Sequence, residues 1–231
     1  MKCRWQVEID PFCQKVLAKH WPNVRRYGDI RGVQHLEPVD LIAGGFPCQD
    51  ISFAGYGAGL DGERSGLWRE FARIIRLVGP RFVVVENVAA LLVRGLGDVL
   101  GTLSHLGFDA EWSIVSACSM GATHMRRRLF IVAYPNRING WPRVWNPNAR
   151  AHGTVQASDS FASARACAKA RLANPSELYG GAYELSSGLD RNRGIGNAVH
   201  PDVAEWIGRR IMTVHAEYVK GATVIAGSGA I

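Results

Sequence analysis

Val39-Asp40-Leu41-Ile42-Ala43-Gly44-Gly45-Phe46-Pro47-Cys48 is a short apolar run that leads into a glycine-proline turn bearing a cysteine. The run from Val39 to Ala43 has the length of a buried strand, and Gly44-Gly45 is predicted to end it. In an open α/β sheet, ligands and reactive groups collect beyond the carboxyl ends of the strands. The pattern makes Cys48 a candidate nucleophile, although a lone cysteine in a turn is more often a small buried side chain.

A second strand is predicted from Phe82 to Val85, because an unbroken, largely β-branched apolar run is typical of a central parallel strand. The run leads into Glu86-Asn87-Val88, so an acid follows this strand as a cysteine follows the first. A thiolate beside a carboxyl group suits addition to an electron-poor ring, with the acid donating to a ring nitrogen. Arg126 and Arg128 are predicted to point the same way from a later strand. They would stabilise the thiolate, an exocyclic oxygen or a phosphate.

Strands and helices alternate through the first 134 residues, which predicts an α/β fold with a doubly wound, mostly parallel, Rossmann-like sheet. Asp10 and Pro11 open the first helix as N-cap and first helical residue. The loop from 44 to 66 is too long and glycine-rich for a passive connection. Further helices are expected at 67–78, 99–106, 163–172 and 202–219, and extended segments at 5–8, 28–30, 108–117 and 129–133.

Three regions follow from this pattern. Residues 1–134 form the core, and 135–193 form a small irregular region rich in Asn, Pro, Ser, Ala and Gly. Residues 194–231 supply a helix that returns to the core and a frayed tail. The whole chain has the composition of a globular protein, with 47% hydrophobic and 20% charged residues.

Neither a membrane span nor a secretion signal is expected. No apolar run approaches the roughly 20 residues that cross a bilayer, and the first residues lack the apolar core of a signal peptide. The five cysteines are an odd number without a CxxC pair. This argues against a zinc site or a disulfide framework and favours a reducing cytoplasm.

The formal charge of +7 is concentrated in one third of the chain. Residues 1–120 hold 13 basic and 13 acidic side chains, and residues 195–231 hold 3 of each, whereas residues 121–194 hold 11 basic and 4 acidic. A localised excess of this kind is typical of a surface that faces a polyanion. A solvated basic face would give the same pattern, so charge alone leaves both interpretations open.

Four motifs occur in the order and spacing of cytosine-C5 DNA methyltransferases of the phage and bacterial type, which this chain resembles over residues 4–134 and 194–212. Each motif alone is unspecific, whereas four in order are highly specific. The resemblance implies that the chain starts after the Phe-x-Gly-x-Gly turn with which the family opens. The motifs are Pro47-Cys48-Gln49, Glu86-Asn87-Val88, the run from His124 (frequently Gln in the family) to Arg128, and Gly196-Asn197-Ala198-Val199.

The resemblance implies a covalent mechanism. Cys48 would add to cytosine C6, Glu86 would protonate the ring near N3, and Arg126 with Arg128 would orient the base. Carbon 5 would then take a methyl group from S-adenosylmethionine and lose its proton before the thiolate leaves. Because C6 is inaccessible in a stacked duplex, the base must flip out, and closure of the loop from Phe46 to Gly66 fits that need.

The resemblance also implies binding residues. Glu8 would hold the ribose hydroxyls of the cofactor, and Asp29 with Ile30 would contact its adenine. Other implied cofactor contacts are Ile9, Pro47, Leu67 and Asn197. The region 135–193 would be a basic target-recognition region. The candidates for DNA contacts are Gln49, Ser52, Arg137, Arg143, Arg150, Arg191 and Arg193.

The expected function is therefore methylation of cytosine C5 in double-stranded DNA by a monomeric, metal-free, cytoplasmic enzyme of a bacterium or a phage-infected cell. The family also implies a restriction-modification system with an endonuclease partner. Two alternatives stay open. One is a tRNA cytosine-C5 methyltransferase, and the other is a catalytically inactive DNA-binding remnant.

Overall fold

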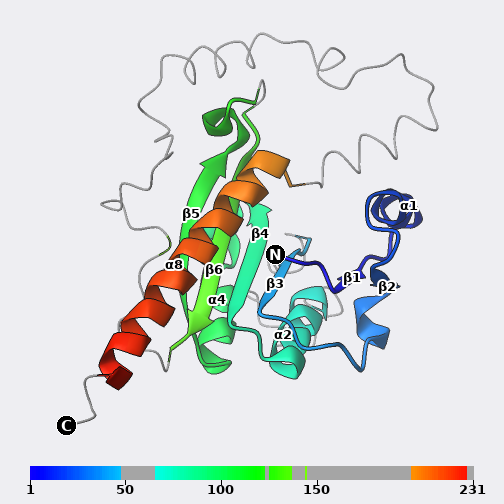
Figure 1. Cartoon of the computed structure of the whole chain (residues 1–231). Helices are drawn as coiled ribbons and strands as arrows, with labels where there is room; N and C mark the ends of the chain where they lie inside the picture. Colours follow the sequence, from blue (N-terminus) through cyan, green and yellow to red (C-terminus); the bar gives the residue numbers. More distant parts are fainter. Residues whose placement is uncertain (48–65, 123–124, 137–143, 145–198, 228–231) are drawn as a thin grey trace.

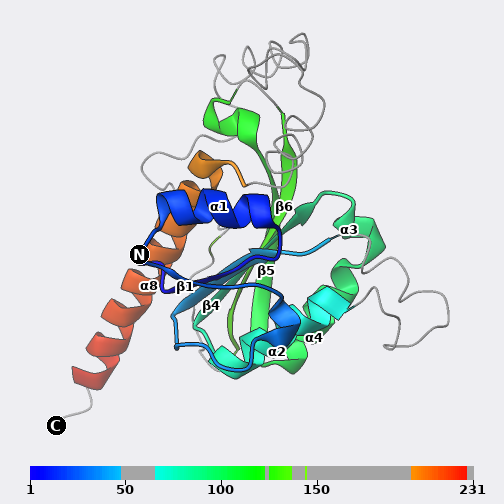
Figure 2. The same cartoon turned by 90° about the vertical axis from the view of Figure 1, so that its right-hand side faces the viewer.

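A four-stranded sheet forms the centre of the computed structural model, which describes residues 1–47, 66–122, 125–136, 144 and 199–227 (Figure 1). Helix α8 (Pro201–Gly227) crosses one face of this sheet, and α2 (Gly66–Val78) and α4 (Leu96–His105) cover the other (Figures 1 and 2). The short helix α3 (Leu91–Arg94) precedes α4. In spatial order the strands are β3 (Leu41–Gly45), β4 (Phe82–Val88), β6 (Arg127–Pro135) and β5 (Phe108–Ser116).

The sheet is mixed, so the prediction of a mostly parallel sheet was wrong. Strands β3 and β4 are parallel, but β6 runs antiparallel to both β4 and β5. The cause is the connection 117–126, which contains the 3₁₀ helix η3 (Ala117–Met120). This connection is shorter than the dozen or more residues that a parallel crossover takes, so the chain must return in the opposite direction. The fold is therefore a mixed α/β fold.

Alternating residues of the central strands face two apolar clusters. Val83 and Val85 of β4 face the cluster under α2 and α4, whereas Phe82 and Val84 face the cluster under α8. Burial on both faces explains why this stretch reads as an unbroken apolar run. The side chains of α8 in its cluster are spaced three or four apart, as expected for one helix face: Val203, Ile207, Ile211 and Val214.

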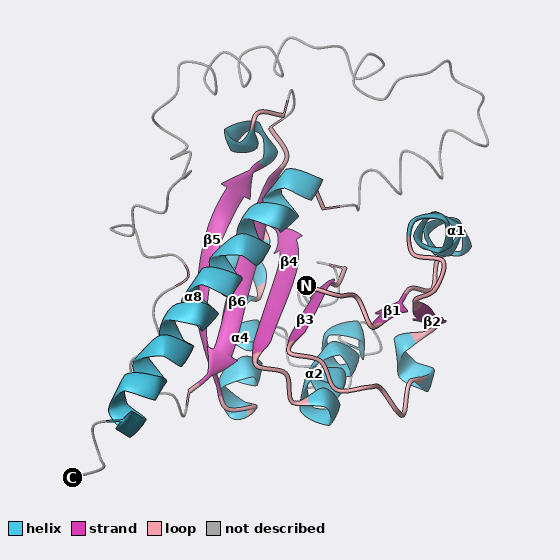
Figure 3. Ribbon diagram, in the orientation of Figure 1, coloured by secondary structure: helices cyan, strands magenta, loops and turns pink. Residues whose placement is uncertain are grey.

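A separate two-stranded sheet lies beside the central one (Figure 3). Its strands β1 (Trp5–Val7) and β2 (Arg25–Tyr27) are parallel and flank α1 (Pro11–His20). Asp10 caps α1 as predicted, because its Oδ1 accepts hydrogen bonds from the N–H groups of Phe12 and Cys13 at 2.8 and 3.0 Å. Side chains of both strands pack against the cluster under α2 and α4.

Strand β3 runs two residues further than predicted, because its glycines allow close packing and do not end the strand. A Cβ atom on Gly44 would lie 3.1 Å from the ring of Phe71 in α2. A Cβ atom on Gly45 would lie 3.0 Å from Glu86 Oε2 and 3.1 Å from the Glu86 carbonyl oxygen. Both glycines are therefore needed for the close approach of the neighbouring elements.

Most predicted elements are present with shifted ends. Helix α2 agrees with the prediction within one residue, α4 begins before the predicted Val99, and α8 continues past Val219. Cys3 and Cys13 form no disulfide bond, whereas Cys118 is disulfide-bonded, although the cysteine count argued against a disulfide framework. None of the helices in the described residues is long and apolar enough to cross a membrane. The helix predicted at 163–172 lies outside the described residues.

Candidate active site at the carboxyl edge of the sheet

Three strands meet at one edge of the central sheet. The parallel strands β3 and β4 both end there, with Gly45 opposite Glu86. Strand β6 begins at the same edge because it is antiparallel to β4, and its residue Arg128 pairs with Val88. In a parallel strand Arg128 would lie at the opposite edge. The mixed orientation therefore brings the arginines to the acid that the sequence analysis singled out.

Glu86 and Arg128 form an ion pair that is largely shielded from water. Arg128 Nε lies 3.0 Å from Glu86 Oε1, and the two side chains are only 21% and 16% exposed, respectively. Burial raises the pKa of Glu86 above its ordinary value of 4.5, while the charges of Arg128 and Arg126 and a hydrogen bond from Arg128 act against this shift. The carboxyl group therefore keeps its proton to a higher pH than a free glutamate does. Such an acid can donate to a ring nitrogen.

Asn87 joins the end of β4 to the end of β3. Its side chain is 4% exposed, and its Nδ2 donates a hydrogen bond of 2.9 Å to the carbonyl oxygen of Phe46. Its Oδ1 accepts from the N–H of Val88 at 2.8 Å. Pro47, the last described residue before position 48, follows directly from this anchored carbonyl. Asn87 had no predicted role, although an amide close behind the apolar run Phe82–Val85 is a usable signal in the sequence.

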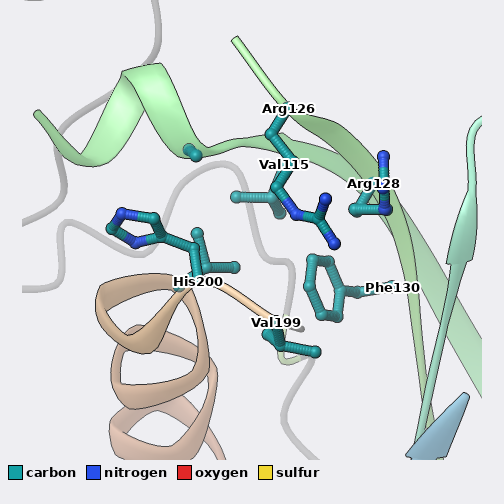
Figure 4. A pocket seen from close by; sticks show the side chains of 8 residues that line it. Val115, Arg126, Arg128, Phe130, Val199 and His200 are labelled. Atoms are coloured by element: carbon teal, nitrogen blue, oxygen red, sulfur yellow. The ribbon is translucent and has the colours of Figure 1, made fainter. Parts of the chain in front are cut away.

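A small cavity lies between the start of β6 and the first turn of α8 (Figure 4). It measures about 10 Å³, room for about one water molecule. Arg126, Arg128 and His200, the residue before α8, all line it. His200 Nδ1 lies 3.8 Å from Asp202 Oδ2. No sequence motif predicted a role for His200.

A second group of residues, predicted to bind the cofactor, lies at the edge of the small sheet where its two strands end. Val7 pairs with Tyr27 in the parallel ladder, so Glu8 and Asp29 follow strands that end together. Glu8 Oε1 accepts a hydrogen bond of 2.8 Å from the N–H of Asp10. Asp29 Oδ1 accepts one of 2.9 Å from the N–H of Arg31 and so caps the 3₁₀ helix η1 (Ile30–Gly32).

The other predicted cofactor residues are placed only in part. Ile9 is 64% exposed beside Glu8, and Ile30 packs against the core cluster under α2. Leu67 is the second residue of α2. Most of the loop from Phe46 to Gly66 lies outside the described residues, and so does the rest of the predicted site. The predictions for these residues stay untested. They are Cys48, Gln49, Ser52, His124, Arg137, Arg143, Arg150, Arg191, Arg193 and Asn197.

Comparison with known protein families matches residues 1–162 to C-5 cytosine-specific DNA methylases. The chain belongs to the C-5 cytosine-specific DNA methylase family. The matched residues include the strand ends that carry Glu86 and Arg128. The family assignment therefore rests on the same part of the chain as the candidate site.

Curated methyltransferases of bacteria are similar to this family member. The type II methyltransferase M2.BsuMI of Bacillus subtilis is 35% identical over 134 residues, which cover 54% of the chain and 34% of the relative. The type II methyltransferase M.Eco47II of Escherichia coli is 34% identical over 154 residues, which cover 60% of the chain and 37% of the relative. The chain thus spans about a third of the length of these relatives.

Solved structures of the DNMT2 type are also similar. A mutant of Spodoptera frugiperda DNMT2 matches with a TM-score of 0.48 and 19% identity, covering 62% of this chain and 45% of that one. The Dnmt2 methyltransferase of S. pombe matches with a TM-score of 0.45 and 16% identity, covering 58% and 42%. These partial overlaps add no argument to the family assignment.

Proposed function

We propose that this member of the C-5 cytosine-specific DNA methylase family transfers a methyl group from S-adenosylmethionine to C5 of a cytosine in double-stranded DNA. The observation that carries the proposal is the shielded pair of Glu86 and Arg128, held at the strand edge from which the chain enters Cys48. A buried acid with a raised pKa, together with the thiol nucleophile that the motifs predict at Cys48, is the combination that addition to a pyrimidine needs.

The proposed reaction uses both groups in sequence. The Cys48 thiolate forms a bond to C6, and the electron pair displaced from the ring double bond makes C5 nucleophilic. Glu86 donates its proton toward N3 and so limits the negative charge on the ring. C5 then bonds to the methyl group of S-adenosylmethionine, whose bond to the sulfonium sulfur would break and release S-adenosylhomocysteine. The C5 proton then passes to a base, the bond between sulfur and C6 breaks, and N3 returns its proton to Glu86, so that the aromatic ring, the thiolate and the acid are restored.

The residues beside the small sheet fit the methyl donor by their chemistry. Glu8 and Asp29 present acceptor oxygens at one edge, which suit ribose hydroxyls and the amino group of adenine. Ile30 would contact the adenine beside Asp29. Further donor contacts are assigned to Ile9, Pro47, Leu67 and Asn197 by the family motifs.

The proposed DNA contacts lie on both sides of the site. Gln49 and Ser52 follow the nucleophile in sequence, so they would contact the flipped nucleotide or the gap it leaves. The basic region 135–193 would supply phosphate and base contacts through Arg137, Arg143, Arg191 and Arg193. The localised positive charge of the sequence supports this role.

Transfer of a radioactive methyl group from labelled S-adenosylmethionine tests the proposal. We expect label in duplex DNA with the wild-type chain and a loss of about a thousandfold or more in Cys48→Ser, because the serine hydroxyl is a far weaker nucleophile. Cys13→Ser is the matched control, since Cys13 lies on α1, forms no disulfide bond and is part of none of the predicted motifs. Cys48→Ser with unchanged activity would contradict the assigned nucleophile.

The same assay separates the other candidate functions. Label in tRNA and not in DNA would indicate an RNA methyltransferase, and DNA binding without any label would indicate an inactive remnant. DNA that contains 5-fluorocytosine tests the covalent step, because fluorine at C5 cannot leave as a proton does. A stable protein-DNA adduct with the wild-type chain, absent in Cys48→Ser, is the expected result.

A further inference from the structure

We infer that Arg73 of α2 is a positioning residue for the adenine end of the methyl donor, because it holds both ends of the turn that follows Asp29. This inference rests on the proposed function, in which Asp29 and Ile30 contact the adenine. Arg73 is part of none of the motifs that the sequence analysis identified.

The guanidinium of Arg73 binds two carbonyl oxygens that bracket η1. Its Nη2 donates to the carbonyl oxygen of Ile30 at 2.8 Å, and its Nη1 donates to that of Val33 at 2.7 Å. These short bonds from a charged donor are stronger than those between neutral groups. The two carbonyl groups belong to the first residue of η1 and to the residue after it, so one side chain fixes the whole turn.

The orientation of the guanidinium is itself fixed. Arg73 Nε lies 2.7 Å from Glu70 Oε2, one turn earlier on α2, and the Arg73 side chain is 38% exposed. Three donors of the planar group are thus used in one geometry, which an arginine can offer and a lysine cannot. Glu70 and the two carbonyl groups together define where the guanidinium lies.

Helix α2 links this contact to the candidate active site. Its buried face, which includes Trp68 and Ile75, packs into the core. On the same face the ring of Phe71 fits against Gly44, the neighbour of Gly45 in β3, where a Cβ atom would lie 3.1 Å from the ring. Gly45 lies opposite Glu86. Arg73 therefore sets the position of η1 relative to the edge that carries Glu86.

The turn η1 places Asp29. The Asp29 carboxylate caps the turn through the N–H of Arg31 at 2.9 Å, and its carbonyl oxygen accepts from the N–H of Gly32 at 3.1 Å. The Asp29 side chain is 40% exposed, so it is accessible to a ligand. A shift of the turn would move this carboxylate and Ile30 together. We therefore expect loss of Arg73 to weaken donor binding without changing the groups that react.

The test compares the full chain with Arg73→Met, Arg73→Lys and the matched control Arg76→Met. Arg76 lies on the same helix one turn later and is exposed. Calorimetry should show the Kd for S-adenosylmethionine raised about tenfold in Arg73→Met, as for the loss of a charged hydrogen bond. We expect a smaller rise in Arg73→Lys and none in Arg76→Met. The Kd for DNA and kcat at saturating donor should stay within about twofold of wild type.

Each other outcome has a definite meaning. A wild-type chain that does not bind S-adenosylmethionine would overturn the proposed function and this inference with it. Wild-type binding with unchanged affinity in Arg73→Met would overturn the inference alone. A parallel loss of donor binding, DNA binding and kcat would also overturn it, because Arg73 would then support only general stability. If thermal denaturation shows that Arg73→Met is unfolded, the donor Kd of Arg73→Lys decides.

Discussion

Burial has a larger effect on the pKa of the Glu86 carboxyl group than the two positive charges beside it. Arg128 and Arg126 favour the ionised form, but removal from water favours the neutral form more strongly and raises the pKa of Glu86. Gly45 adds to this shielding, because only a residue without a Cβ atom lets β3 lie so close to the Glu86 carboxylate. Arg128 pairs with the ionised carboxylate, and the raised pKa lets the same carboxyl group take up a proton at a higher pH than a free glutamate does.

The raised pKa of Glu86 predicts a pH dependence of the reaction. The value of kcat/KM should fall as the pH rises through this pKa, because the ionised carboxylate can no longer donate a proton. Glu86→Gln cannot ionise, so this variant should be about a hundredfold slower and should lack that limb of the profile. Initial rates of methyl transfer across a pH series test this, with the exposed Glu205→Gln as control.

The raised pKa of Glu86 also predicts how the free energy of unfolding depends on pH. An acid whose folded-state pKa lies above its unfolded value stabilises the fold below its ordinary pKa, and this contribution is lost as the pH rises through the raised one. Urea denaturation of the wild type should show this loss over that range, and Glu86→Gln should not show it. Equal pH dependence in the two proteins would contradict the assigned pKa direction.

Among the elements, β6 has the largest effect on the site. Its reversed direction places Arg128 next to Glu86, so an element that broke the expected parallel pattern is the one that completes the candidate site. A connection long enough for a parallel crossover, a dozen or more residues, would have sent the arginines to the other edge. The length of a short connection thus decides which side chains meet.

Val144 shows how a residue beyond β6 is anchored to the core. It is fully buried in the cluster under α8. Its N–H donates to Glu111 Oε1 at 3.1 Å, and its carbonyl oxygen accepts from Arg210 Nε at 2.5 Å. Tyr134 donates to the same Glu111 oxygen at 2.9 Å.

Burial lowers the pKa of Arg210, and the charge of Glu111 acts against that shift.

Truncation of Val144 should therefore destabilise the fold. Val144→Ala removes two buried methyl groups and leaves a cavity, with an expected loss of about 2 kcal/mol in the free energy of unfolding. Val93→Ala is the control, because Val93 is 87% exposed and its truncation should change little. Urea denaturation of both variants gives the comparison. Equal stability of Val144→Ala and wild type would contradict the anchoring role.

For the whole molecule, the distribution of charge along the chain predicts how DNA binding depends on salt. The excess of +7 lies in residues 121–194, whereas the rest of the chain is balanced. Each phosphate contact releases counterions, so the DNA affinity should fall steeply as the salt concentration rises. The four arginines proposed to contact DNA predict a slope of about −4 in log K against log salt concentration. Arg191→Ala and Arg193→Ala should each reduce the slope by about 1. Fluorescence anisotropy over a salt series measures it.

The control for this experiment is Arg94→Ala. Arg94 is an exposed arginine at the end of α3, in the part of the chain with balanced charge. We expect its slope to equal that of the wild type. A wild-type affinity that does not depend on salt would contradict the assignment of residues 121–194 as the DNA-facing region.

The sequence by itself determined the strands that contain Leu41–Ala43 and Phe82–Val85, the cap of α1 at Asp10, and the family, because these depend on local periodicity and on motifs in order. Local patterns are readable since each helix or strand repeats its apolar residues with its own period and so presents its own apolar face. Only the tertiary structure decided the direction of β6, the contact of Arg128 with Glu86 and the contact of Arg73 with η1. These join residues far apart in the chain, and no local pattern encodes the distance between two side chains that meet only after folding.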